Sequence, residues 1–198
     1  MQHIFIINPT AGKVDASVAL IPQIHAAASR AGVRPTIEVT RRAGQARDLA
    51  AKYASSGQEV FLYACGGDGT LNEVVTGLMQ SEVRPPLGYI PAGTTNDFAT
   101  SLGIPKVPAD AAVIAAGDFL HALDIGRFNG RYFNYIAAFG VFTEVSYATP
   151  QQSKNIFGRA AYIMQGVMSL ANIKEYRIRV NSPEMQTEDH FIYGMVTN

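Results

Sequence analysis

A glycine-rich segment at residues 65–73, with the sequence CGGDGTLNE, holds the densest group of residues that could take part in chemistry. It follows an apolar run typical of a buried strand and precedes a pattern typical of a helix. Glycines at such a junction allow a sharp turn, and the free N–H groups where a helix begins attract an anion such as phosphate. Asp68 would repel a bare phosphate, so we infer that Mg²⁺ lies between them. A helix cap formed by Asp68 is the alternative.

Two further polar loops have a similar character. Residues 8–13, NPTAGK, and residues 91–98, PAGTTNDF, each follow an apolar run, and Thr40 ends another such run. Their backbone N–H groups, hydroxyls and amides, together with the carboxylates of Asp68 and Asp97, suit a nucleotide triphosphate and its metal. The three loops therefore predict a nucleotide site, provided that the fold brings them together.

The glycine-rich segment differs from the two best-known phosphate-binding loops. A P-loop requires a lysine after its glycines, whereas Thr70 follows Gly69 here. The dinucleotide-binding pattern G-x-G-x-x-G begins at Gly67 but has Asn72 where the last glycine should stand. Both assignments are excluded by the residues themselves.

The elements before these loops must position them. The hydrophobic pattern predicts strands at residues 3–7, 33–40, 59–64 and 87–90, and helices at 16–31, 44–55, 71–79 and 109–116. This alternation is typical of the α/β class, an open, mostly parallel, Rossmann-like sheet with helices on both faces. Because ligands of such sheets bind beyond the carboxyl ends of the strands, we expect all three loops and Thr40 to meet in one crevice.

The pattern changes near residue 120. Asn129-Gly130 between apolar runs at 121–128 and 131–138 predicts a hairpin. Residues 153–171 have a helical pattern, and residues 175–180 and 191–196 are predicted strands. We therefore predict a nucleotide-binding α/β catalytic domain at 1–120, followed by an incomplete β-rich domain at 121–198.

Composition narrows the class of protein. The 198 residues carry 16 basic and 16 acidic side chains, for a net charge of zero, whereas a nucleic-acid-binding protein normally has a basic excess. The single cysteine excludes a disulfide framework, and the apolar runs fall short of the ~18 residues of a membrane span. The N-terminus also lacks a signal-peptide pattern, so we expect a cytoplasmic protein that binds no nucleic acid.

The three loops together resemble those of the diacylglycerol kinase catalytic-domain family, and most of all the soluble bacterial lipid kinases. The matching stretches are residues 8–13, 66–73 and 91–99, and the resemblance continues through residues 145–150. Sphingosine kinases share this superfamily, as do NAD kinases and phosphofructokinase-like enzymes at greater distance. The resemblance therefore implies a kinase without identifying its acceptor lipid.

The resemblance implies ATP-dependent transfer of the γ-phosphate to a hydroxyl of diacylglycerol or a related lipid. ATP and Mg²⁺ are the implied cofactors, and residues 121–198 would be part of a lipid-binding domain. Asp68 and Asp97 are the residues implied to act on the metal. The residues implied to contact the nucleotide are Asn8, Pro9, Thr10, Ala11, Gly12, Thr40, Gly66, Gly67, Asp68, Gly69, Thr70, Leu71, Asn72, Glu73 and Thr94.

Members of the family are longer than this chain, and the resemblance places their general base beyond Asn198. We therefore expect the chain alone to be inactive, and the full enzyme to be a cytoplasmic protein in transient contact with the inner membrane face. Whether the protein forms a homodimer is left open. The alternatives are an NAD kinase-like phosphotransferase and a non-catalytic nucleotide-sensing module.

Overall fold

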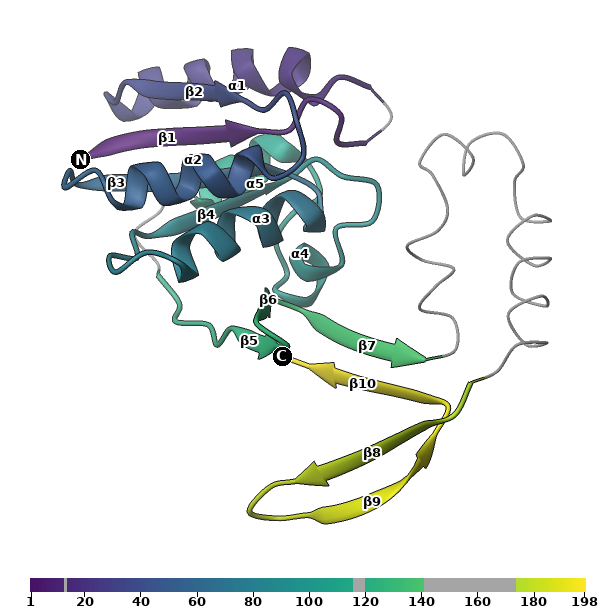
Figure 1. The fold of residues 1–198 in the computed structure, drawn as a ribbon. Coiled ribbons are helices and arrows are strands. Elements are labelled where there is room, and N and C mark those ends of the chain that lie inside the picture. The colour runs from purple at the N-terminus through teal and green to yellow at the C-terminus, as the bar shows by residue number, and fades with distance from the viewer. Residues whose placement is uncertain (13, 116–119, 141–173) are drawn as a thin grey trace. The chain divides into compact units, whose positions relative to one another are not determined.

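The computed structural model describes residues 1–12, 14–115, 120–140 and 174–198 (Figure 1). These residues divide into two compact units, Met1–Tyr135 and Ile136–Asn198. The predicted boundary near residue 120 stays a prediction. In the structure, the hairpin that follows it belongs to the first compact unit.

A parallel sheet forms the centre of the first unit. Its described strands are β1 (Gln2–Ile7), β2 (Pro35–Val39), β3 (Val60–Gly66) and β4 (Leu87–Pro91), in the spatial order β2-β1-β3-β4. All three neighbouring pairs run parallel, which confirms the predicted α/β class. The chain moves outward from β1 to β2 and then crosses back to β3. The direction of winding therefore reverses between β1 and β3, which is where ligands of such sheets bind.

Helices cover both faces of this sheet, as the alternation of the strand residues requires (Figure 1). Ile4 and Ile6 of β1 pack with the buried residues of α2 (Gln45–Ala54) and α3 (Asp68–Met79). Phe5 and Ile7 pack on the opposite face with residues of α1 (Ala16–Ala31) and α5 (Pro108–Ala115). Because every residue of β3 is buried, the glycine-rich loop emerges from the most enclosed strand of the sheet.

Two helices and one hairpin of the first unit differ from the prediction. The α3 helix begins at Asp68, whereas the hydrophobic pattern predicted Leu71, and a short helix, α4 (Asp97–Ser101), occupies a stretch predicted as loop. The predicted hairpin is confirmed, but its strands, β5 (Gly126–Phe128) and β6 (Arg131–Phe133), are shorter than expected. Asn129 and Gly130 have φ values of 47° and 78°, the conformation of a type I′ turn.

The second unit contains only antiparallel pairs among its described residues. Strand β7 (Ile136–Gly140) pairs with β10 (Tyr193–Thr197), and β8 (Tyr176–Asn181) pairs with β9 (Gln186–Phe191). The strand predicted at 175–180 is confirmed as β8. The last strand predicted at 191–196 is confirmed as β10, which begins two residues later, whereas β9 was not predicted. The helix predicted at 153–171 lies outside the described residues, and no described helix has the length and apolar character needed to span a membrane.

A phenol–carboxylate contact joins α2 to the edge strand β2. The Tyr53 hydroxyl donates a hydrogen bond to Glu38 Oε1. Burial, and then the hydrogen bond and negative charge of Glu38, raise the pKa of Tyr53 to about 12. An unfolded tyrosine ionises near pH 10, so this contribution to stability is present below about pH 10 and is lost as the pH rises toward 12.

We expect Tyr53→Phe to lower the free energy of unfolding by about 1–2 kcal/mol at pH 7, because a hydrogen bond to a charged group is lost. Urea unfolding at pH 7 and pH 11 measures the effect. The difference between variant and wild type should shrink at the higher pH. A difference that grows with pH would contradict this account of the contact.

Candidate active site

The carboxyl ends of the four parallel strands are joined by backbone hydrogen bonds that continue past the strands themselves. Asn8 donates its N–H to the Cys65 carbonyl at 2.9 Å, and Thr40 donates to the Ile7 carbonyl at 2.8 Å. Ala92 donates to the Gly66 carbonyl, also at 2.8 Å. The loops that follow β1, β2, β3 and β4 therefore begin side by side at one edge of the sheet, as the topology predicted.

Glycines bring these loops into backbone contact. A Cβ atom on Gly93 would lie 2.5 Å from the Cα of Gly67, and one on Gly12 would lie 2.8 Å from the carbonyl oxygen of Ala92. Gly12 also has a φ of 81°, which side chains of the L configuration rarely adopt. Only residues without a side chain allow the three loops to approach this closely.

Asn8 and Thr70 tie the first loop to the glycine-rich loop. Asn8 Nδ2 donates to Thr70 Oγ1 at 3.0 Å. Asn8 Oδ1 in turn accepts from the Thr10 N–H at 3.0 Å and from the Thr10 hydroxyl at 2.9 Å. A Cβ on Gly66 would lie 2.5 Å from Thr70 Oγ1, so the buried hydroxyl fits directly against a glycine backbone.

Asp68 connects the glycine-rich loop to the loop after β4. Its Oδ2 accepts from the Asp97 N–H at 3.0 Å, and its Oδ1 accepts from the Phe98 N–H at 3.2 Å. These donors are the first two residues of α4, so the carboxylate caps a helix other than its own and stabilises the positive end of its dipole. Asp68 therefore does form a cap, but of α4 and not of α3.

Asn96 and Tyr89 are residues that the sequence argument did not assign to the site. Asn96 is 6 % exposed and has a φ of 54°. Its Oδ1 accepts from the Gly93 N–H at 3.0 Å, and its Nδ2 donates to the Gly93 carbonyl at 2.9 Å. Asparagine tolerates positive φ better than most residues, and that preference was the available signal for Asn96.

Tyr89 lies near both carboxylates of the site. Burial, and then the charges of Asp68 and Asp97, raise the pKa of Tyr89, so its phenol stays neutral.

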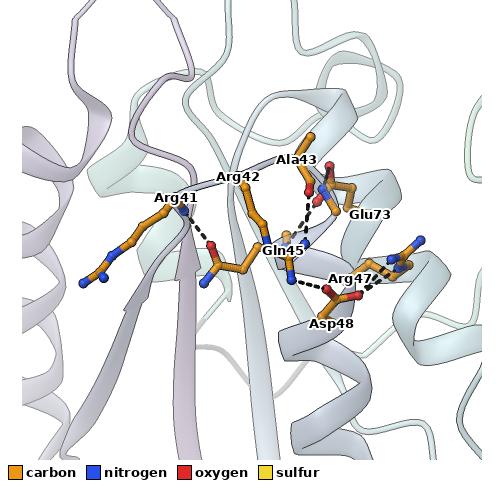
Figure 2. Close-up of polar contacts among 9 residues, drawn as sticks. Arg41, Arg42, Ala43, Gln45, Arg47, Asp48 and Glu73 are labelled. Atoms are coloured by element: carbon orange, nitrogen blue, oxygen red, sulfur yellow. Dashed lines mark hydrogen bonds and ion pairs between the residues drawn. The ribbon is translucent and has the colours of Figure 1, made fainter.

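Glu73 lies beside the start of α2 (Figure 2). Its Oε1 accepts from the Gly44 N–H at 2.9 Å, and its Oε2 accepts from the Ala46 N–H at 3.2 Å. Beside it, Asp48 receives the guanidinium groups of Arg42 and Arg47 at 2.7 and 2.9 Å. Arg42 is therefore engaged within its own loop, and its guanidinium is held by the first turn of α2.

The structure gathers most of the predicted site residues at one edge but gives their side chains different surroundings. The Ala11 and Leu71 side chains lie in the core, so only their backbone atoms face the loops. Thr94 is exposed, and the buried Asn72 Oδ1 has no hydrogen-bond partner among the described residues. Within those same residues, no three His, Cys, Asp or Glu side chains gather as a metal cluster.

Comparison with known proteins gives one consistent family. The model of the diacylglycerol kinase catalytic domain matches residues 2–128. A diacylglycerol kinase of Staphylococcus saprophyticus is 38% identical over 175 residues, which cover 88% of this chain and 57% of that protein. A diacylglycerol kinase of Bacillus subtilis is 38% identical over 176 residues, with the same coverage of both chains.

The fold is similar as well. A crystal structure of a diacylglycerol kinase from Bacillus anthracis matches with a TM-score of 0.72 and 27% identity, covering 100% of this chain and 64% of the other. The chain thus spans between half and two thirds of the length of the relatives that it matches.

Proposed function

Because the chain belongs to the diacylglycerol kinase catalytic domain family, we propose that the protein transfers the γ-phosphoryl group of ATP to a hydroxyl of diacylglycerol or a related lipid. The observation that carries this proposal is the meeting of three glycine-containing loops at the carboxyl edge of the sheet. Their backbones lack bulky side chains where a triphosphate would lie. The N–H groups at the start of α3 supply positive potential there.

The proposed nucleotide site consists of residues 8–12, Thr40, residues 66–72 and Thr94. Phosphoryl transfer depends mainly on positioning and on stabilising negative charge, so a rigid set of loops suits it. The hydrogen bonds of Asn8 with Thr70, and of Asp68 with residues 97 and 98, support such rigidity. These residues would bind and orient the triphosphate without taking part in covalent chemistry.

Asp68 and Asp97 fit Mg²⁺ in number and kind of donor. Mg²⁺ usually takes one or two protein carboxylates and completes its shell with water and phosphate oxygens. The two residues are adjacent, since the Asp97 N–H bonds to Asp68, and the Asp97 side chain is exposed. Each Asp68 oxygen accepts one N–H and keeps capacity for a second contact. Bound Mg²⁺ would neutralise charge that develops on the phosphates.

A membrane lipid as acceptor also implies where the protein acts. We propose that it is a cytoplasmic enzyme that contacts the inner membrane face transiently, because diacylglycerol partitions into the bilayer.

The test is an assay of full-length protein with radiolabelled ATP and Mg²⁺ against vesicles that contain single acceptor lipids, with NAD as a separate acceptor. We expect label to enter a lipid, and we expect ATP with Mg²⁺ to raise the melting temperature more than either does alone. Label in NAD alone would favour an NAD kinase. Nucleotide binding without transfer to any acceptor would favour a sensing module.

A further inference from the structure

Glu73 supplies a cap that α2 cannot supply for itself. The N-cap residue of α2 is Gly44, which has no side chain and a φ of 77°. The first N–H groups of any helix lack partners within the helix. Both oxygens of Glu73 accept such groups, from Gly44 and from Ala46 (Figure 2). A carboxylate from α3 thus stabilises the positive end of the neighbouring helix.

The segment between β2 and α2, residues 40–44, is held at both ends. At its start, the Thr40 N–H bonds to the Ile7 carbonyl. At its end, the Gly44 N–H donates to Glu73, and the Arg41 N–H bonds across the segment to Gln45 Oε1 at 2.6 Å. The path of the chain between Thr40 and α2 therefore depends on where α2 begins.

The body of α2 is placed against α3 by close backbone packing. A Cβ on Gly77 of α3 would lie 2.3 Å from the Arg47 carbonyl oxygen and 2.9 Å from the Ala50 Cβ. Glu73 lies one helical turn before Gly77 on the same side of α3. The two residues together fix both the distance between the helices and the level at which α2 starts relative to the glycine-rich loop.

We propose that Glu73 is a positioning residue, which couples the glycine-rich loop to the Thr40 loop and does not itself contact the nucleotide. This inference rests on the proposed nucleotide site and changes the role that the family resemblance implied for Glu73. Both carboxylate oxygens already accept N–H groups at the start of α2, which is the geometric reason. Loss of the carboxylate would free the start of α2 and let residues 40–44 leave the binding-competent arrangement.

The effect should fall on nucleotide affinity. If the competent arrangement of residues 40–44 drops to about one tenth of the population, the Kd for ATP and its KM rise about tenfold. The turnover number should change less than about twofold, because molecules that have bound ATP have the loop in place and uniform binding does not enter kcat. Glu73→Gln keeps one acceptor oxygen and should give an intermediate rise.

The experiment compares full-length wild type with Glu73→Ala and Glu73→Gln, and uses Glu82→Gln, an exposed carboxylate beyond the end of α3, as the matched control. Kinetics give KM for ATP and kcat, and equilibrium titration without lipid gives the Kd for ATP. Hydrogen exchange of the Gly44 and Ala46 amides is measured in nucleotide-free protein and should be faster in Glu73→Ala than in the control.

A fall in kcat with an unchanged KM would overturn the proposal, because Glu73 would then act in the transfer step. Unchanged hydrogen exchange at Gly44 and Ala46 would overturn it as well. The exchange experiment needs no substrate, so it separates this proposal from the proposed function. If the wild type transfers no phosphate to lipid, exchange and the Kd for ATP still decide the role of Glu73. If Glu73→Ala fails to fold, Glu73→Gln carries both measurements.

Discussion

Gly93→Ala should reduce phosphate transfer to lipid by about 100-fold, since a displacement of about 1 Å in a positioning loop can cost that much in rate. The added Cβ would lie 2.5 Å from the Cα of Gly67, 2.7 Å from Asn96 Oδ1 and 3.2 Å from the Gly67 nitrogen. Two of these are backbone atoms, which cannot rotate away. The loops after β3 and β4 must therefore separate, and Asn96 must give up its paired hydrogen bonds with Gly93.

The same substitution should lower the free energy of unfolding by about 1–3 kcal/mol, as overpacking of a close contact does. Urea unfolding measures this loss, and vesicle assays of the full-length protein measure the transfer rate. Gly69→Ala is the matched control for stability, because a Cβ at Gly69 meets no atom within 4 Å. Full activity in Gly93→Ala would show that contact between the two loops is not required.

The fold of the first unit could be predicted because its signals are local. Apolar runs that end in glycine or polar residues mark the parallel strands, and α1 covers the predicted stretch, residues 16–31, despite Pro22 within it. The start of α3 could not be predicted, because glycine and threonine at 69 and 70 have low helix propensity. In the folded protein, Thr70 is buried against Gly66 and bonded to Asn8, and these tertiary contacts extend the helix by a turn.

The site was predictable as a place but not as a set of contacts. Topology alone puts residues 8–12, 40, 66–70 and 93–97 at one edge of the sheet. It cannot say that Asp68 caps α4 or that Glu73 caps α2, because each carboxylate bonds N–H groups 27 to 30 residues away. The polar residues of the glycine-rich segment indicated ligand binding. In the structure, the side chains of Asp68, Thr70 and Glu73 hold neighbouring segments in place.

Asp68 has two roles, a proposed contact with Mg²⁺ and the cap of α4, and substitution can separate them. We expect Asp68→Ala to lower transfer to lipid by about 100-fold, the upper end of the range for loss of a residue that orients a metal. It should also cost about 0.5–2 kcal/mol of stability, because the Asp97 and Phe98 N–H groups lose their cap. Radiolabelled transfer and urea unfolding of the full-length protein measure the two effects.

Asp68→Asn distinguishes a metal role from a capping role, because asparagine keeps one acceptor oxygen for the N–H groups of Asp97 and Phe98 but carries no charge. If the carboxylate serves Mg²⁺, Asp68→Asn loses less stability than Asp68→Ala, loses about as much activity, and needs more Mg²⁺ for half-maximal rate. If capping is its whole role, Asp68→Asn keeps most of its activity at an unchanged Mg²⁺ requirement. Asp110→Asn, an exposed carboxylate in the first turn of α5, controls for the loss of one negative charge. Because the amide keeps part of the cap without the charge, the activity of Asp68→Asn relative to Asp68→Ala decides whether Asp68 acts on the metal or only on α4.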